Sequence, residues 1–297
     1  MISSFFKNKK VILFYGSKGW IGSLFLDYLK LNHHTLTIIE GTSRIENEDD
    51  VNAEIKKHKP KFVVSFTGRT HGVINNEKIN TIDYLEYPGK LVENIKDNLF
   101  GPVILANICK KYKIHYTYLG TGCIFNNTKE ILSFSEESKP NYFGSGYSVV
   151  KGFTDNLMKQ LNVLNLRIRM PISSIKNERN FITKIANYKK ICSIDNSMTV
   201  LDDFFPIFID LILKKKTGTY NCTNPGTINH NDILYMYKEI IDPSFEWENM
   251  SLYEQSQILK SERSNNKLCT DKIKKEYPKL KNINESIKIV LNKMILQ

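Results

Sequence analysis

Short apolar runs alternate with longer stretches of helical spacing through the first half of the chain. The run over residues 11–15 is typical of a buried strand, and residues 21–31 place apolar side chains on one helical face. The same rhythm predicts strands over residues 35–39, 62–66, 115–119 and 164–168, and helices over residues 50–58, 85–112 and 147–160. Strands that alternate with helices of this length indicate βαβ units with right-handed crossovers. We therefore expect an α/β fold with a doubly wound parallel sheet.

The alternation loosens after Pro171. The pattern there predicts helices over residues 181–188 and 202–213, a short strand over residues 218–222, and a mostly helical, more polar tail from residue 231. We expect a first domain over residues 1–170 and a smaller second domain over residues 171–297. One or two segments of the second domain are expected to cross back and extend the sheet.

The length of 297 residues suits about two domains. The hydrophobic share of 41% and the charged share of 25% are ordinary for a globular protein. A net charge of +11 favours anionic partners, which include nucleic acid, a membrane surface and phosphorylated metabolites. Lys and Arg are spread along the whole chain without a block typical of a nucleic-acid arm. We therefore expect neither nucleic acid nor membrane as a partner.

The five cysteines are odd in number, and no two have C-x-x-C spacing. This disfavours a disulfide framework and a structural zinc site, so no metal is expected. Free thiols fit a reducing cytoplasm. Every apolar run is far shorter than the ~20 residues that span a bilayer, and the first ten residues do not have the form of a signal peptide. We expect a cytoplasmic protein.

A glycine-rich turn follows the first predicted strand and opens the first predicted helix. It reads G-x-x-G-x-x-G over Gly16, Ser17, Lys18, Gly19, Trp20, Ile21 and Gly22. Gly16 allows a tight turn, Gly19 lets a pyrophosphate approach the backbone, and Gly22 lets the helix pack on the sheet. The helix N-terminus offers free N–H groups to the phosphates. The turn predicts a dinucleotide site, and the alternative is a helix preceded by a flexible glycine turn.

The nature of the dinucleotide depends on the end of the second strand. Glu40 lies there, where a carboxylate favours the ribose 2′-hydroxyl of NAD. Lys18 in the turn and Arg44 beyond the strand suit a 2′-phosphate. We expect NADPH, with NADH as the alternative, and solvated surface charges as the simple explanation of both cations.

Tyr147 and Lys151 form a Y-x-x-x-K motif at the start of a predicted helix. Their i,i+4 spacing places both on one face, where an ammonium group would lower the pKa of the phenol. Tyr147 is thus a candidate general acid toward a carbonyl oxygen. Thr121 ends a predicted strand of the sheet, where ligands bind, so its hydroxyl is expected beside Tyr147.

Together, the glycine turn, Thr121 and Tyr147-x-x-x-Lys151 resemble an extended short-chain dehydrogenase/reductase. More closely, the chain is similar to the plant-type UDP-4-keto-6-deoxyglucose 3,5-epimerase/4-reductase family. The matching stretches are GWIG (19–22), TGCIF (121–125), RIRMPIS (167–173), RNFITK (179–184), TNPG (223–226) and RSNN (263–266). The resemblance implies an NADP-binding Rossmann domain, a nucleotide-sugar-binding domain, and hydride delivery to a C4 ketone with roles for Thr121, Tyr147 and Lys151.

The same resemblance implies an acid/base pair for epimerisation. Cys123 stands two residues after Thr121, as a catalytic cysteine does in the related GDP-fucose synthase. The partner attributed to the plant-type family is a lysine, which matches Lys184. Bacterial dTDP-rhamnose reductases carry Thr-Asp-Tyr where this chain has Thr-Gly-Cys, which disfavours a pure reductase. The simple alternatives are an inert buried thiol and a solvated lysine.

A nucleotide sugar also needs a cationic clamp for its diphosphate. Arg263 can grip phosphate oxygens bidentately, and amides are available from Asn180, Asn265 and Asn266. Asn98 is expected at the nicotinamide end of the site, and His71 with Arg69 is expected to line the pocket. Arg179 is interpreted as a surface cation.

These observations predict an enzyme that converts UDP-4-keto-6-deoxy-D-glucose to UDP-β-L-rhamnose by 3,5-epimerisation and NADPH-dependent 4-reduction. The alternatives are a 4-keto reductase without epimerase activity and a non-catalytic NADP-binding regulatory subunit. The base of the nucleotide, UDP or dTDP, stays open. A separate upstream 4,6-dehydratase is expected to supply the substrate, and a homodimer is the family-level expectation.

Overall fold

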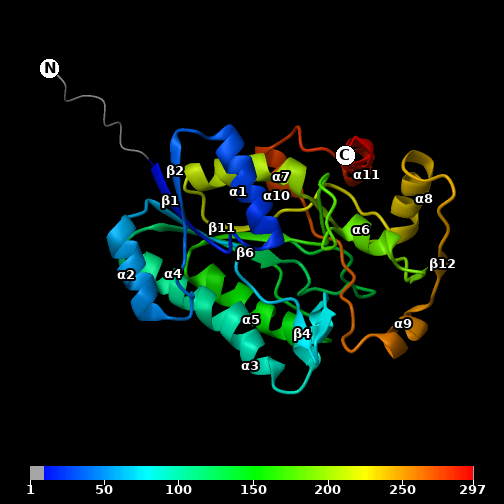
Figure 1. Ribbon diagram of the computed structural model, residues 1–297, viewed down its shortest axis with the longest axis horizontal. Coiled ribbons are helices and arrows are strands. Elements are labelled where there is room, and N and C mark those ends of the chain that lie inside the picture. The colour runs from blue at the N-terminus through cyan, green and yellow to red at the C-terminus, as the bar shows by residue number, and fades with distance from the viewer. Residues whose placement is uncertain (1–9, 297) are drawn as a thin grey trace.

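The computed structural model describes residues 10–296, so the N-terminal stretch that we judged unlike a signal peptide lies largely outside it. Its centre is a six-stranded parallel sheet in the order β11-β7-β6-β3-β1-β2 (Figure 1). The strands are β1 (Lys10–Tyr15), β2 (Leu36–Glu40), β3 (Phe62–Ser65), β6 (His115–Thr121), β7 (Leu164–Ile168) and β11 (Gly218–Asn221). The predicted doubly wound parallel sheet is confirmed.

Helices cover both faces of the sheet (Figure 1). On one face lie α1 (Trp20–Asn32), α7 (Leu201–Leu213) and α10 (Asp271–Glu276), and on the other lie α2 (Glu48–His58), α4 (Gly101–Lys111) and α5 (Gly146–Gln160). Successive residues of β1 point to opposite faces, so Phe14 packs with Phe25 of α1 while Leu13 packs with Leu105 of α4. Because both faces are buried, the strand is a continuous apolar run rather than an alternating one.

A smaller lobe has its own core, in which Ile182, Ile233 and Ile287 are fully buried. Its elements are β8 (Pro171–Ile172), α6 (Phe181–Ala186), β9 (Lys190–Ile191), β10 (Thr199–Val200), α8 (His230–Ile240), β12 (Glu248–Asn249), α9 (Leu252–Ile258) and α11 (Ile283–Ile295). Within the same part of the sequence, α7 and β11 belong to the sheet layer, where β11 pairs with β7. Over residues 10–296, no helix is long and apolar enough to cross a membrane.

The single helix predicted over residues 85–112 is wrong. A 3₁₀-helix (Ile82–Glu86), α3 (Lys90–Ile95), a π-helical turn (Lys96–Phe100) and α4 replace it. Gly89 has φ +80° before α3, and the chain then stays helical from Lys90 to Lys111 through the π-helical turn. Pro102 cannot donate to the Asn98 carbonyl, which accepts from Thr154 Oγ1 instead. The π-helical turn brings Asn98 into the interior.

A short hairpin beside this segment was not predicted. β4 (Gly72–Ile74) and β5 (Glu77–Ile79) pair across Asn75 and Asn76, which both have positive φ. Two such residues fit a two-residue hairpin turn, so the Asn-Asn pair was the available sequence signal. The hairpin lies at the lower edge of the molecule, near α3, in Figure 1.

A buried ion pair fixes α5 to the sheet. Arg167 of β7 donates from Nε and Nη2 to the two carboxylate oxygens of Asp155, at 2.8 and 2.6 Å. Both side chains are excluded from solvent, and such a bidentate pair has strict geometry. The first turns of α5, which carry Tyr147 and Lys151, are therefore held in a defined position above the strand ends.

Candidate functional site

The glycine turn lies where the strand order reverses, since β1 has β2 on one side and β3 on the other. Gly16 has φ +85°, and a Cβ there would come within 2.7 Å of the Phe66 carbonyl carbon. A Cβ at Gly22 would lie 2.0 Å from the Gly16 oxygen. Gly22 therefore permits close packing of α1 against the turn, and not against the sheet as we expected.

The N-terminus of α1 is free to bind an anion. Its N-cap, Gly19, provides no side-chain cap, and the first helical turn contains no acidic residue. Trp20 and Ile21 pack against the core beneath, and the buried Trp20 Nε1 has no hydrogen-bond partner. Lys18 is exposed at the tip of the turn. The open N–H groups, the helix dipole and an unpartnered buried donor fit the phosphates of a nicotinamide dinucleotide.

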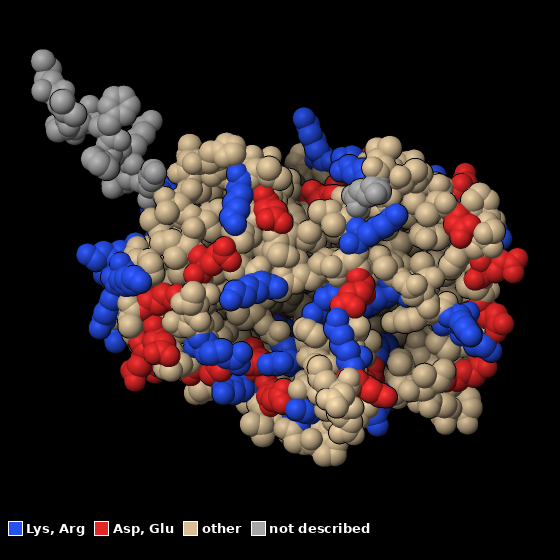
Figure 2. Space-filling view, in the orientation of Figure 1, with Lys and Arg blue, Asp and Glu red and all other residues tan. Residues whose placement is uncertain are grey.

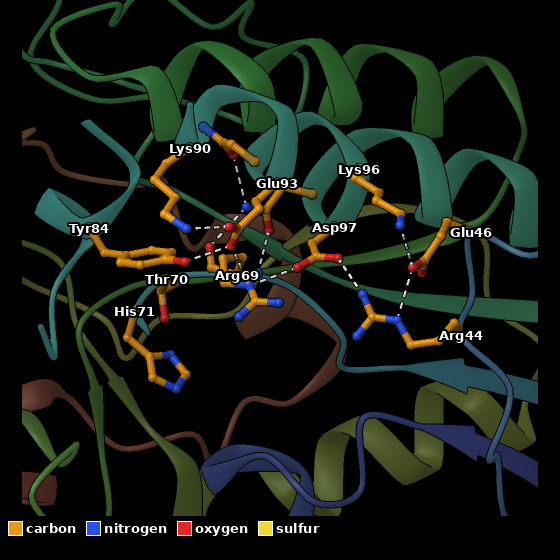
Figure 3. A network of polar contacts seen from close by, with 12 residues as sticks. Arg44, Glu46, Arg69, Thr70, His71, Tyr84, Lys90, Glu93, Lys96 and Asp97 are labelled. Atoms are coloured by element: carbon orange, nitrogen blue, oxygen red, sulfur yellow. Dashed lines mark hydrogen bonds and ion pairs between the residues drawn. The ribbon is translucent and has the colours of Figure 1, made fainter. Parts of the chain in front are cut away.

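Glu40, the last residue of β2, and Arg44 beyond it both have partners within the protein. Glu40 accepts a 2.8 Å hydrogen bond from Ser17 of the turn. Arg44 is largely exposed and pairs with Glu46 and Asp97 at 2.9 and 3.0 Å. Figure 3 shows this chain of ion pairs running from the end of β2 to the π-helical turn.

Asn98 has a different role from the expected one. Its side chain is buried, accepts from the backbone N–H of Arg69 and donates to the Arg69 carbonyl. Asp97 next to it binds Arg69 Nε at 2.7 Å (Figure 3). The polar ends of Asn98 are thus used by the loop after β3, so Asn98 shapes this loop rather than presenting its amide to a cofactor.

The end of β6 and the start of α5 bring the predicted catalytic residues together. Thr121 Oγ1 accepts a 3.0 Å hydrogen bond from the Cys123 N–H, and the Cys123 side chain packs beside Tyr147. Ser145 caps α5 by accepting from the backbone N–H of Ser148, whose hydroxyl donates to the Cys123 carbonyl at 2.7 Å. The helix cap therefore fixes the strand-end loop and the tyrosine relative to each other.

The pKa of the Tyr147 phenol is raised, whereas the sequence predicted that Lys151 would lower it. Burial, and next the Cys123 sulfur, raise its pKa, while a hydrogen bond with Thr121 lowers it. Lys151 is not among the groups that move this pKa. Tyr147 therefore keeps its proton at working pH and can donate a hydrogen bond to an oxyanion.

Lys151 is fully enclosed, and its ammonium donates to the hydroxyl of Tyr118. Its Nζ also lies 4.5 Å from the centroid of the Tyr118 ring. Burial lowers the pKa of Lys151 to about 7, although Asp155 and Cys123 raise it. Sequence reasoning missed Tyr118, because a tyrosine in a buried strand is a common core residue.

Lys184 lies in α6 and approaches the hairpin, where its Nζ donates to the Asn80 carbonyl at 3.1 Å. Burial, then Arg179 and Arg263, lower the pKa of Lys184 to about 8. Arg263 also acts on Tyr142, as does Cys123. Arg263 is thus near both Lys184 and Tyr142, and we call the space around these three side chains the basin.

His71 and Arg179 form a second part of this basin. The guanidinium nitrogens of Arg179 lie 2.8 Å from the two ring nitrogens of His71, and one donates to Thr70 at 3.0 Å. Burial, then Arg179, lower the pKa of His71 to about 4, so its ring is neutral at pH 7. Arg179 is half-buried here, which corrects its interpretation as a surface cation.

The expected diphosphate clamp is only partly supported. Arg263 pairs with the carboxylate of Asp83 in a salt bridge that sequence reasoning missed. That carboxylate also accepts from the Ser261 backbone N–H at 3.0 Å, and the Arg263 side chain is 24% exposed. A ligand can therefore reach the guanidinium only beside this carboxylate.

The asparagines are structural in this arrangement. Asn180 is fully buried and caps α6, and Asn266 is fully buried and donates to the carbonyls of Gly122 and Phe125. Asn265 accepts from Asn196 at 2.9 Å. These contacts correct the expectation that Asn180 and Asn266 face the substrate; they support the walls of the site.

Lys and Arg are interspersed with Asp and Glu on the face in Figure 2. Among the residues that the structure describes, no cluster of His, Cys, Asp and Glu could hold a metal ion. All five cysteines are free thiols.

Comparisons with known proteins agree with this geometry. Residues 12–187 match the model of the NAD dependent epimerase/dehydratase family. The chain is 42% identical over 282 residues to a bifunctional dTDP-4-dehydrorhamnose 3,5-epimerase/reductase of Arabidopsis thaliana, covering 93% of this chain and 90% of the relative. It spans only about 41% of the length of a 39% identical trifunctional plant relative.

Solved structures give the same result. The crystal structure of the L780 UDP-rhamnose synthase from Acanthamoeba polyphaga mimivirus superposes with a TM-score of 0.92 at 51% identity, covering 96% of this chain and all of that one. A dTDP-4-dehydrorhamnose reductase from Bacillus anthracis, 16% identical with a TM-score of 0.79, shares the fold. The resemblance inferred from the sequence is confirmed: this chain belongs to the NAD dependent epimerase/dehydratase family of extended short-chain dehydrogenases/reductases and is an NAD(P)-dependent enzyme.

Proposed function

We propose that the protein inverts C3 and C5 of UDP-4-keto-6-deoxy-D-glucose and then reduces C4 with NADPH, which yields UDP-β-L-rhamnose. The observation that carries the proposal is the cluster at the end of β6, in which Thr121, Tyr147 and Lys151 are buried and Cys123 is half-buried beside them. The similarity to a plant 3,5-epimerase/reductase of dTDP-4-dehydrorhamnose supports the two reactions, and the similarity to the mimivirus UDP-rhamnose synthase supports a UDP sugar.

Inversion begins with removal of a proton beside the C4 ketone. The C–H bond breaks, the proton moves to Cys123 as a thiolate, and the electron pair forms an enolate with its charge on O4. Tyr147 remains protonated because its pKa is raised, so it can donate to this oxyanion together with Thr121. Losing one such donor typically costs on the order of 10²-fold in rate.

Lys184 is suited to return a proton to the opposite face of the ring. Its pKa of about 8 leaves it mostly as the ammonium at pH 7 and still acidic enough to donate. After each inversion, exchange with solvent restores the thiolate and the ammonium. Cys123 and Lys184 thus act as acceptor and donor around a planar enolate.

Reduction uses the same oxygen contacts. The nicotinamide cofactor, when bound, supplies hydride to the ketone carbon. Tyr147 protonates O4, and Lys151 is placed one helical turn further along α5 to bind the nicotinamide ribose. Its pKa of about 7 allows it to pass a proton toward the tyrosine near neutrality.

The half-buried cations Arg179 and Lys184, with the partly exposed Arg263, line the basin that would take the diphosphate. The substrate is a ketone at C4 that lacks oxygen at C6, so a dehydratase that oxidises C4 and removes water must supply it. Free cysteines support a reducing compartment such as the cytoplasm as the place of this reaction.

The inversion step can be tested by solvent exchange. Cys123→Ser and Lys184→Met are each expected to slow deuterium incorporation at C3 and C5 from D₂O by about 100-fold or more, because each removes one proton carrier. The measurement is NMR of the UDP-sugar product with NADPH present. Cys269→Ser and Lys190→Met are the matched controls and should keep the wild-type rate.

Incorporation at both carbons in the Cys123→Ser and Lys184→Met variants at the wild-type rate would contradict the assignment. Turnover of pre-epimerised keto-sugar without any exchange in the wild type would instead identify a reductase without epimerase activity. NADPH oxidation that is absent with every keto-sugar would identify a non-catalytic subunit.

The pH dependence of exchange follows from Lys184. As the pH rises through about 8, the ammonium loses its proton and the donor form disappears, so the exchange rate should fall. Lys184→Arg keeps the charge but cannot release a proton near neutral pH, so it should slow exchange at every pH and show no fall near pH 8. A rate that rises through pH 8 would show that Lys184 acts as the base instead.

Cofactor preference depends on Arg44 and Lys18 in this proposal. Arg44→Ala is expected to weaken NADPH binding about tenfold, which corresponds to ~1.4 kcal/mol, and to leave NADH binding unchanged. Lys96→Ala is the control, because Lys96 also pairs with Glu46, at 3.4 Å, but lies on the π-helical turn. An equal loss for both dinucleotides in Arg44→Ala would contradict a 2′-phosphate contact.

We also propose a homodimer through the outer face of α3 and the π-helical turn. Leu91, Val92, Ile95 and Phe100 are between 41% and 69% exposed there, and Val92, Ile95 and Phe100 with Lys96 line a shallow groove. Contiguous exposed apolar surface of this kind marks interaction sites. A second copy of the chain would pack its own α3 and π-helical turn against this surface and so bury both apolar faces.

Val92→Glu is expected to shift the sedimenting species from about twice the chain mass of 34.5 kDa to the chain mass. Tyr253→Glu, equally exposed but on α9, should leave the dimer intact. Sedimentation velocity measures both, and a wild-type chain that sediments as a monomer would overturn the proposal.

A further inference from the structure

A fully buried arginine lies directly beyond the end of β7. Arg169 is 1% exposed, and its guanidinium donates to the hydroxyl of Ser264 at 2.7 Å, to the Ser264 carbonyl and to the side-chain oxygen of Asn196. In the described residues, no carboxylate lies within 4.0 Å of it. Arg167, two residues earlier, has Asp155 as its carboxylate partner.

This arrangement leaves the charge of Arg169 without compensation. Every acceptor on Ser264 and Asn196 is neutral, and Arg169 Nε is buried without a hydrogen-bond partner. Burying a cation is costly unless an anion accompanies it. The site therefore requires a negative group close to the guanidinium.

The Cys123 sulfur is in the position where that negative charge is needed. Arg169 Nη1 lies 3.5 Å from Sγ with donor geometry. Because the same nitrogen also binds Ser264, the guanidinium cannot turn away from the thiol without losing that hydrogen bond. The Arg169–Cys123 contact is therefore fixed, because the hydrogen bonds of Nη2 to Asn196 and to the Ser264 carbonyl also hold the guanidinium in place.

The remaining ionisable groups around Cys123 do not supply the anion. Burial raises the pKa of both Tyr142 and Tyr147, so these phenols stay neutral. Lys151 brings a further positive charge when it is protonated, and it also acts on Cys123. None of these three side chains supplies the anion, whereas the Cys123 sulfur is in direct contact with the guanidinium.

We propose that Arg169 is the positioning residue of Cys123: it holds the sulfur beside Tyr147 and stabilises its thiolate. This inference rests on the proposed function for its catalytic meaning, since a held thiolate is the form that takes a proton from the sugar. The ionic contact itself exists in the free enzyme, where it can be measured without any sugar.

The test is the pH dependence of alkylation of Cys123 by iodoacetamide, followed by mass spectrometry of the peptide that contains it. Arg169→Gln is expected to move the midpoint of the rate upward by about one pH unit, and so to slow alkylation roughly tenfold at pH 7. Arg169→Lys keeps the positive charge but loses the planar guanidinium, so its midpoint should lie between those of the wild type and Arg169→Gln. Lys214→Gln, which removes an exposed cation at the end of α7, is the control and should leave the midpoint unchanged.

An unchanged midpoint in a folded Arg169→Gln variant would overturn the proposal. Because Arg169 is buried, a second measurement leaves it in place and compares the thermal unfolding of the wild type and of Cys123→Ser from pH 6 to pH 9. A thiolate stabilised in the folded state adds stability above the ordinary cysteine range and loses it as the pH falls. The advantage of the wild type should therefore grow with pH, and a constant difference contradicts the inference.

Solvent exchange separates this inference from the proposed function. A shifted alkylation midpoint together with normal deuterium exchange in Cys123→Ser would retain the ionic contact and reject the catalytic role of the thiol. Suppose instead that Cys123→Ser loses exchange while the alkylation midpoint is the same in the wild type and in Arg169→Gln. The thiol would then keep its catalytic role, and its control by Arg169 would be rejected.

Discussion

Burial of cations without carboxylate partners is the constraint on which the site depends. Lys151 and Arg169 are buried and Lys184 is half-buried. Each donates to a neutral oxygen atom: the Tyr118 hydroxyl, the Ser264 hydroxyl and the Asn80 carbonyl, respectively. Burial lowers the pKa of all three groups. A site of this kind is stabilised by anions, and phosphates, an enolate and a thiolate are the anions that the proposed reaction brings.

Two arginines of the sheet region, Arg167 and Arg69, have carboxylate partners and serve the scaffold. Arg167 with Asp155 fastens α5 to β7, and Arg69 with Asp97 fastens the loop after β3 to the π-helical turn. A paired buried charge is strongly position-specific, because removal of either partner leaves the other uncompensated. The paired arginines therefore set the geometry in which the unpaired cations act.

The need to satisfy buried polar groups also explains why three asparagines do not have the ligand-binding roles that the sequence predicted. Asn98, Asn180 and Asn266 carry amides that could bind a ligand, but the amides satisfy buried backbone groups instead. Loops that surround an active site expose many backbone N–H and C=O groups, and buried ones need partners. Side-chain amides at such positions therefore support the walls of the site.

The sequence by itself determined the parallel sheet, the glycine turn and the association of Thr121 with Tyr147, because these depend on local periodicity and on the ends of parallel strands meeting at one edge. It did not determine that the helical run would begin only after Gly89 and contain a π-helical turn, or that Lys151 would donate to Tyr118. Nor did it place Arg169 beside Cys123, although the second arginine of RIRMPIS was a visible signal. Contacts between side chains 46 residues apart, and the burial that changes their charge, arise only when the sheet and the small lobe close around the same space.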